Sequence, residues 1–212
     1  MAASWKTSMI TPTDALPGHA SPVFAVPETN IVLGTPLLGS WPGTEVIYVA
    51  AGCFWGVEEM YWLLPGVVAT SVGYMGGYST NPTYEEVCTG LTGHTETTLV
   101  AYDPRRVSTH DVLRLFWEHH DPTQGYRQGN DIGTQYRSAL FVTNPEQRML
   151  AEQTRASFQR VLDERSYGAI TTEILDAANH VYYPAEPIHQ QYLAKVPNGY
   201  RCHAATGLTL PS

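Results

Sequence analysis

The feature that most constrains the fold of this chain is an alternation of strand-like and helical segments that begins at Glu45. Runs rich in β-branched and aromatic residues predict strands, and apolar residues three or four positions apart predict helices. The predicted strands span 45–51, 66–77, 94–104, 135–142 and 169–177, and the predicted helices start after Cys53, Ser108 and Asn144. This β-α-β-β-α-β order is typical of a ferredoxin-like split βαβ core. We therefore expect an α+β fold, a two-layer sandwich of mixed sheet and helices with extra terminal segments.

The two ends of the chain lack this periodicity. Residues 1–44 hold six of the fifteen prolines, which predicts an irregular Pro-rich arm. Residues 195–212 contain Pro, Gly and Asn and little periodicity, which predicts a flexible tail. Between them, residues 45–194 are long enough to form one globular domain with a sizeable core, since 43% of the chain is apolar.

The charge of the chain excludes several kinds of partner. Twelve basic against twenty acidic residues give a net charge of -8, which does not suit nucleic acid or an anionic membrane surface. The chain also lacks an apolar run of about 18 residues, the length needed to span a membrane. The N-terminal residues MAASWKTSMI have no apolar core of a secretory signal. We therefore expect a cytoplasmic protein.

The chain has three cysteines, Cys53, Cys88 and Cys202. An odd number without a C-x-x-C pair argues against a disulfide scaffold and against a cysteine-rich zinc site. Histidines and carboxylates do not occur at metal-ligand spacing either, so we expect no metal. In a reducing cytosol each thiol starts free, and its position decides between packing and chemistry.

Cys53 lies in the sequence GCFWG, at the junction of the first predicted strand and helix. The unpaired N–H groups at a helix start favour a thiolate, whereas a buried thiol at a tight turn is the alternative interpretation. Gly52 and Gly56 allow a tight turn and close access for a substrate. Phe54 and Trp55 beside the thiol predict an apolar pocket for an uncharged, thioether-like group.

Five motifs occur in order along the chain: GCFWG at 52–56, GHTE at 93–96, QGNDIGTQYRS at 128–138, HQQYL at 189–193 and NGYRC at 198–202. Together they resemble the A-type peptide methionine sulfoxide reductases, and the resemblance covers most of residues 45–203. It implies reduction of the S epimer of methionine sulfoxide, in proteins and as the free amino acid. Residues 1–44 resemble, more loosely, the N-terminal extension of longer bacterial members.

The resemblance assigns roles to several side chains. A sulfoxide is a poor electrophile at sulfur until its oxygen is protonated, so the reaction needs a soft nucleophile and an acid. Cys53 is the implied nucleophile and Glu96 the implied acid, since a carboxyl beside an aromatic pocket has a raised pKa. Tyr84 and Tyr136 match the tyrosines that donate to the same oxygen, and Asp131 matches the residue that orders this network.

The resemblance also implies how the enzyme is recycled. Attack by Cys53 leaves a sulfenic acid, which condenses with Cys202 on the tail to give a disulfide that thioredoxin opens. No cofactor is expected besides this external dithiol, and we expect a monomer. Some relatives carry a second distal cysteine that is absent here, and Cys88 is expected to serve packing. His94, two residues before Glu96, is expected to border the substrate site.

Two other functions remain open at this point. The first is a cysteine acyl-transfer hydrolase with His94 or His189 as its base, which would need no second thiol. The second is a non-enzymatic module whose aromatic pocket binds methionine-rich peptides while the thiol is structural.

Overall fold

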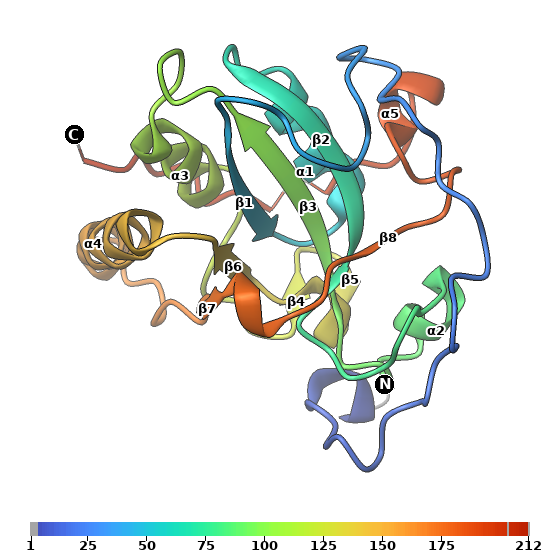
Figure 1. The fold of residues 1–212 in the computed structure, drawn as a ribbon. Helices are drawn as coiled ribbons and strands as arrows, with labels where there is room; N and C mark the ends of the chain where they lie inside the picture. The colour runs from blue at the N-terminus through green and yellow to red at the C-terminus, as the bar shows by residue number, and fades with distance from the viewer. Residues whose placement is uncertain (1–3, 203, 212) are drawn as a thin grey trace.

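The centre of the molecule is a six-stranded sheet with the strand order β7-β6-β1-β3-β2-β8 (Figure 1). The computed structural model describes residues 4–202 and 204–211, so residues 1–3 of the predicted arm and 203 and 212 of the predicted tail lie outside it. The strands of this sheet are β1 (Glu45–Ala50), β2 (Val67–Met75), β3 (Thr95–Tyr102), β6 (Ala139–Val142), β7 (Glu173–Asp176) and β8 (Tyr183–Pro184). A separate two-stranded sheet pairs β4 (Arg127–Gln128) with β5 (Asp131–Ile132).

The helices differ widely in length. The α-helices are α1 (Phe54–Trp62), α2 (Tyr84–Cys88), α3 (Thr109–Glu118), α4 (Pro145–Glu164) and α5 (Tyr192–Lys195), and short 3₁₀ turns span Ser4–Thr7, Thr134–Tyr136 and Ala177–Asn179. The two longer helices, α3 and α4, begin where the sequence predicted and are capped there. The side chain of Ser108 accepts a hydrogen bond from the N–H of Asp111, and the side chain of Asn144 accepts one from the N–H of Gln147.

The strand directions confirm the predicted fold class. β3 is antiparallel to both β1 and β2, so β1 and β2 run parallel with β3 inserted between them. β6 pairs antiparallel with the other edge of β1. This is the split βαβ arrangement expected from the sequence. β7 then adds in parallel to β6, which makes the sheet mixed.

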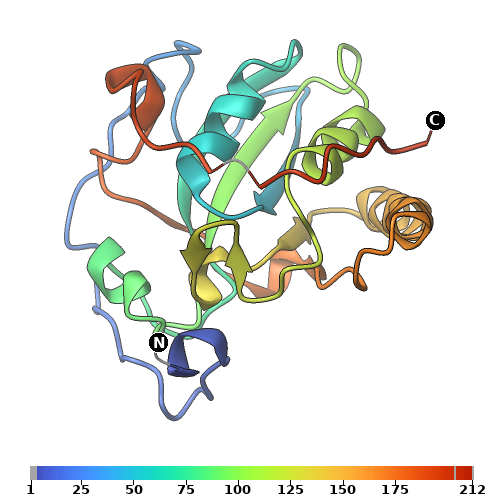
Figure 2. The same cartoon turned by 180° about the vertical axis from the view of Figure 1, so that it is seen from behind.

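Helices α1, α3 and α4 share one apolar core with the sheet, and Figure 2 shows α1 and α3 in front of it. Ile47 and Val49 of β1 belong to this core, whereas Tyr48 and Ala50 pack on the opposite face. This alternation follows from the two-residue period of a strand. Because both faces of β1 are packed against apolar residues, the run after Glu45 is apolar and predicts a strand.

The arm, residues 4–44 in the described part, covers the opposite face and one edge of the sheet (Figure 1). Trp41 is buried against this face, and the fully buried Asn30 donates to the carbonyl oxygen of Thr70 in β2 at 2.9 Å. At the other end of the chain, Leu210 packs against the core that these helices share, and its N–H donates to Glu118 of α3 at 2.8 Å. Both terminal segments are therefore packed on the domain.

Several short elements depart from the sequence prediction, among them β4, β5 and α5, which were not predicted. The strand expected over 135–142 starts at Ala139, because Thr134–Tyr136 forms a 3₁₀ turn, and the strand expected over 169–177 is limited to Glu173–Asp176. Helix α2 and strand β8 were not predicted, since five and two residues are too few for a periodic pattern. None of the helices in the part of the chain that the structure describes has the length and hydrophobicity of a membrane-spanning helix.

Candidate active site

Cys53 is the N-cap of α1, directly after the turn that ends β1. The turn requires glycine at position 52, because Gly52 has φ +92° and a Cβ there would lie 2.6 Å from Cγ of Gln128. Only 7% of Cys53 is exposed. The predicted tight turn at the strand-to-helix junction is therefore present, and Gln128 fills the space beneath it.

The protonation of the Cys53 thiol is set by two opposing influences. Burial, and then the charge of Glu96, raise the pKa of this thiol well above its ordinary value. The backbone N–H groups of Trp55 and Gly56 act in the opposite direction, as expected at a helix start, but they are outweighed. The thiol is therefore protonated near neutral pH, in contrast to the thiolate predicted from the sequence.

Glu96 lies on β3 and is almost completely buried. Its Oε2 accepts the N–H of Phe54, the residue after Cys53, at 2.9 Å. Burial raises the pKa of Glu96 from 4.5 to about 8, the charge of Asp131 adds to this, and the Phe54 N–H opposes it. The carboxyl is thus protonated near neutral pH and able to donate, next to the candidate nucleophile.

Tyr84 and Tyr136 are brought to the same carboxyl from two different elements. Tyr84 starts α2 and Tyr136 ends a 3₁₀ turn. Burial raises the pKa of both phenols, and the charge of Glu96 is the next cause for each. Both hydroxyls therefore stay protonated and lie within the electrostatic reach of Glu96, as hydrogen-bond donors should.

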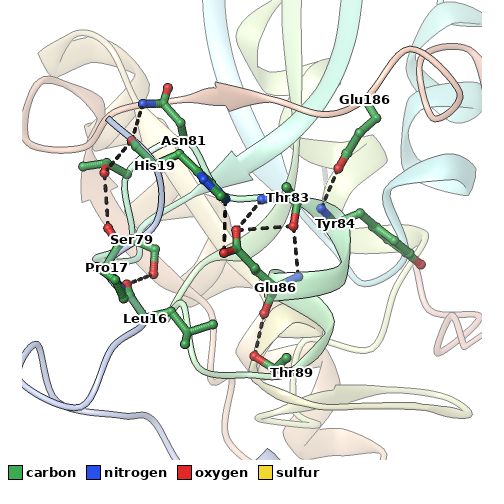
Figure 3. Close-up of polar contacts among 11 residues, drawn as sticks. Leu16, Pro17, His19, Ser79, Asn81, Thr83, Tyr84, Glu86, Thr89 and Glu186 are labelled. Carbon is green, nitrogen blue, oxygen red and sulfur yellow. Dashed lines mark hydrogen bonds and ion pairs between the residues drawn. The ribbon is translucent and has the colours of Figure 1, made fainter. Parts of the chain in front are cut away.

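Helix α2 is fixed in place from both of its sides (Figure 3). Its N-cap Thr83 and Glu86 form a capping box, and the N–H of Tyr84 donates to Glu186 Oε1 at 2.7 Å. From the arm, Nε2 of His19 lies 3.3 Å from Oε1 of Glu86. The arm thus contacts the short helix that carries Tyr84.

An aromatic group surrounds the start of α1. The ring of Trp55 stacks on Tyr192 with centroids 4.0 Å apart, and the ring of His189 lies 4.3 Å from that of Tyr84. Phe54 stacks on Tyr84 at 6.3 Å. Trp55 Nε1 donates to His189 Nδ1 at 3.2 Å, so the second ring nitrogen of His189 carries its proton. The predicted apolar wall of Phe54 and Trp55 is thus extended by two residues of the HQQYL motif.

Cys202 and Cys53 line the same cavity of about 620 Å³, between α1, α3, Gln128 and the tail. Figure 2 shows the tail crossing in front of α1 and α3. The thiol of Cys202 donates to the carbonyl oxygen of Gln128 at 3.3 Å, and Tyr200 Oη lies 3.1 Å from both carboxylate oxygens of Asp131. Burial, followed by the charge of Asp131, raises the pKa of Cys202 to about 11.

Two other residues singled out from the sequence have different surroundings. His94 accepts the N–H of Gly77 at Nδ1, and its Nε2 lies 2.8 Å from the carbonyl oxygen of Ser79. Burial lowers its pKa to about 4, so the neutral ring supports this loop. Cys88 hydrogen-bonds Tyr84, and burial and then the charge of Glu96 raise the pKa of Cys88. Among the described residues, no cluster of His, Cys, Asp or Glu is arranged to hold a metal.

Comparison with known proteins decides the family. Residues 45–210 match the family model described as peptide methionine sulfoxide reductase. The chain belongs to this family. It is 52% identical over 202 residues to the peptide methionine sulfoxide reductase MsrA of Streptomyces griseus, covering 95% of this chain and 91% of the relative. It is 54% identical over 198 residues to MsrA 1 of Caulobacter vibrioides, covering 93% and 90%.

Solved structures agree with this family. Methionine sulfoxide reductase A of Corynebacterium diphtheriae superposes with a TM-score of 0.86 at 46% identity, covering 97% of this chain and all of the other. Reduced Mxr1 from Saccharomyces cerevisiae superposes with a TM-score of 0.68 at 32% sequence identity, covering 82% of this chain and 96% of Mxr1. Mxr1 in complex with Trx2 superposes with a TM-score of 0.50 at 22% sequence identity, covering 79% of this chain and 94% of the other. This likeness supports the fold.

Membership of the family confirms the predicted activity. The chain is an oxidoreductase that reduces methionine S-sulfoxide to methionine. The hydrolase and peptide-binding alternatives are therefore wrong. The structure adds two residues to the surroundings of the site, Tyr192 and Glu186, to which the motifs assigned no role. Outside the groups that face the sulfoxide, Arg201 of the tail bonds Glu59 of α1 at 2.6 Å. The HQQYL and NGYRC motifs were the available signals for Tyr192 and Arg201.

Proposed function

We propose that Cys53 is the nucleophile of the reduction and Glu96 its general acid. The Cys53 sulfur attacks the sulfoxide sulfur while Glu96 gives its proton to the oxygen. The sulfur–oxygen bond of the substrate then breaks, the hydroxyl ends on the Cys53 sulfur as a sulfenic acid, methionine leaves, and the thiol proton of Cys53 restores the acid form of Glu96. The observation that carries this assignment is the hydrogen bond from the N–H of Phe54 to Glu96, two residues that are 42 positions apart in the sequence. Because Phe54 follows Cys53, this bond holds the acid beside the nucleophile. A protonated Glu96 also removes its charge, which is one of the three causes that disfavour the Cys53 thiolate, after burial and before the charge of Asp131.

The remaining groups position the substrate. Tyr84 and Tyr136 donate to the sulfoxide oxygen, and Asp131 orders this polar network, a role supported by its effect on the pKa of Glu96. Phe54 and Trp55 hold the methyl group, since an apolar aromatic wall favours an uncharged thioether. Gly52 forms the tight turn that presents Cys53 to the substrate, and His94 supports the loop beside the site. The same site accepts free and protein-bound methionine sulfoxide.

Recycling uses the tail. Reduction leaves a sulfenic acid on Cys53, and the thiol of Cys202 condenses with it to form a disulfide and water. Thioredoxin then opens this disulfide by thiol exchange, so no bound cofactor is needed. The presence of both thiols on one cavity supports this step, and the complex of yeast Mxr1 with Trx2 supports thioredoxin as the reductant.

The rest of the chain serves this site. We propose a catalytic domain over 45–194, an arm over 1–44 that braces it and a flexible tail over 195–212 that carries the resolving thiol. The protein is proposed to act as a monomer in the cytoplasm, on oxidised proteins and without nucleic acid or membrane partners, in keeping with its net charge of -8.

Mass spectrometry of the enzyme after substrate, without reductant, tests the proposal. The expected result is about one methionine released per enzyme, a bond between Cys53 and Cys202, and a Cys88 that still reacts with an alkylating agent. Free and peptide-bound methionine sulfoxide should both leave the enzyme with the same Cys53–Cys202 disulfide. A disulfide that includes Cys88, or release of methionine with both Cys53 and Cys202 still alkylated, would overturn the assignment.

A further inference from the structure

Three consecutive tail residues contact three different elements of the domain. Tyr200 bonds Asp131 of β5, Cys202 bonds the backbone of Gln128 in β4, and Arg201 bonds Glu59 of α1. The first two contacts involve a neutral hydroxyl and a weak thiol donor. Arg201 makes the contact in which both side chains carry a charge, and a bidentate pair of opposite charges is the stronger kind.

The pairing of Arg201 with Glu59 is bidentate. Nε donates to Glu59 Oε2 at 2.6 Å and Nη2 donates to Oε1 at 2.7 Å. The third nitrogen of the guanidinium, Nη1, donates to the carbonyl oxygens of Pro197 and Gly199 at 2.8 and 3.3 Å. One side chain thus fixes its own loop and ties that loop to α1.

The position of the pair relates it to both thiols. Glu59 lies on the helix whose first turn holds Cys53, and Arg201 is the residue before Cys202. All four residues line the same cavity. A contact between Glu59 and Arg201 therefore restricts the separation of the two sulfur atoms.

We propose that the Arg201–Glu59 ion pair is a positioning pair for the resolving step, which holds Cys202 over the cavity and sets the rate at which it captures oxidised Cys53. The inference rests on the proposed function of the two cysteines. In this step the Cys202 sulfur attacks the sulfenic sulfur, an S–S bond forms and the S–O bond breaks. The hydroxyl leaves as water with the thiol proton, so no further oxidant is needed.

The size of the effect follows from exposure. The side chains of Arg201 and Glu59 are 28% and 24% exposed, so solvent screens the pair in part. We expect Arg201→Ala to slow disulfide formation roughly fivefold, the range for a bidentate pair near the surface. The burst of methionine should keep its rate, because neither residue belongs to the groups that act on the sulfoxide.

Rapid quenching with an alkylating agent, followed by mass spectrometry, measures both rates in one experiment. The variants are Arg201→Ala, Glu59→Gln and the double variant. If the two residues act as a pair, the double variant should form the disulfide no more slowly than the slower single variant. Arg105→Ala is the matched control, since Arg105 makes a similar bidentate pair with Asp103 at 2.8 and 2.9 Å outside this cavity. The control should form the disulfide at the unmodified rate.

The outcomes separate this proposal from the one on which it rests. Equal rates of disulfide formation in Arg201→Ala and the control would overturn the positioning role, and so would additive effects of the two single changes. Failure of the unmodified protein to form the Cys53–Cys202 bond would instead contradict the proposed function. A trap for sulfenic acid, such as dimedone, gives a second readout. It should label Cys53 of Arg201→Ala more than Cys53 of the control, and equal labelling would count against the pair.

Discussion

The two cysteines of the proposed redox pair are held in very different ways. Cys53 sits between a central strand and a helix, on a turn fixed by Gly52 and tied to β3 through Glu96. Cys202 lies on a segment outside helix and strand that is held by contacts of neighbouring side chains. The fold fixes the group that must meet a small substrate. The group that must also reach an external protein is attached by contacts that can release.

Replacing each cysteine by serine gives the largest expected difference between these two regions. Cys53→Ser should reduce methionine formation to background, because the nucleophile is lost. Cys202→Ser should still release about one methionine per enzyme in a single turnover, but thioredoxin-driven turnover should stop. Chromatography of methionine with and without thioredoxin measures both. Sustained thioredoxin-driven turnover by Cys202→Ser would show that the tail is not required.

Glu96→Gln addresses the buried region alone. The amide keeps an oxygen that accepts the Phe54 N–H, but it cannot supply a proton. The rate of the methionine burst should fall by about 10² to 10⁴, the usual range for a general acid. Once Cys53 is oxidised, disulfide formation should proceed at the unmodified rate. A burst at the unmodified rate would mean that the tyrosines alone activate the sulfoxide.

The pH dependence of the burst sharpens the role of Glu96. Its pKa is raised from 4.5 to about 8 by burial, so the acid is protonated below pH 8 and loses its proton above. Relative to the burst rate of Glu96→Gln, the burst rate should therefore fall about tenfold per pH unit above 8, because the thiolate fraction of Cys53 rises alike in both proteins. A ratio of the two rates that does not change with pH would contradict the role of Glu96 as the acid.

The same shift in the pKa of Glu96 affects folding. The folded state binds the proton more tightly than the unfolded state, so the free energy of unfolding should decrease as pH rises from 4.5 to 8. Denaturant titrations across this range measure the contribution. Glu96→Gln should remove this decrease. If the free energy of unfolding of the variant still fell with pH as steeply as that of the unmodified protein, the decrease would belong to other groups.

A comparison of stability gives the smallest expected effects. Gly52→Ala should lower the free energy of unfolding by about 2–4 kcal/mol, since φ is +92° and the new methyl meets Gln128. Tyr200→Phe should cost about 1 kcal/mol or less, because its bond to Asp131 lies at the surface. Urea titrations measure both. Similar losses in the two variants would contradict the contrast between the two regions.

The sequence predicted regular elements better than short ones. The strands around the core were visible because residues such as Ile47 and Val49 alternate with those of the other face. Helix α2 has only five residues, yet the Thr83 and Glu86 capping box was a readable signal for it. Strand β8 has two residues and depends on its pairing with β2, which no local pattern encodes.

Site residues were recognised from motifs, but their environment was not. A helix start near Cys53 predicted a thiolate, whereas the raised pKa of this thiol comes mainly from burial and then from Glu96. Burial depends on the whole fold and leaves no mark at a single position. The ion pair of Glu59 and Arg201 joins residues 142 positions apart, beyond any spacing rule. Contacts of this length become visible only in three dimensions.

The contacts of the arm bear on how far this enzyme can be shortened. The family model spans 45–210 and leaves out His19, which pairs with Glu86, and Asn30, which bonds the backbone of Thr70. A chain trimmed to those limits would keep every proposed reacting group and still lose these supports for α2 and β2. Family boundaries drawn from sequence similarity therefore understate the packed unit here, and an expression design for this protein should begin upstream of residue 16, whose carbonyl oxygen accepts a hydrogen bond from Ser79 in the loop before α2.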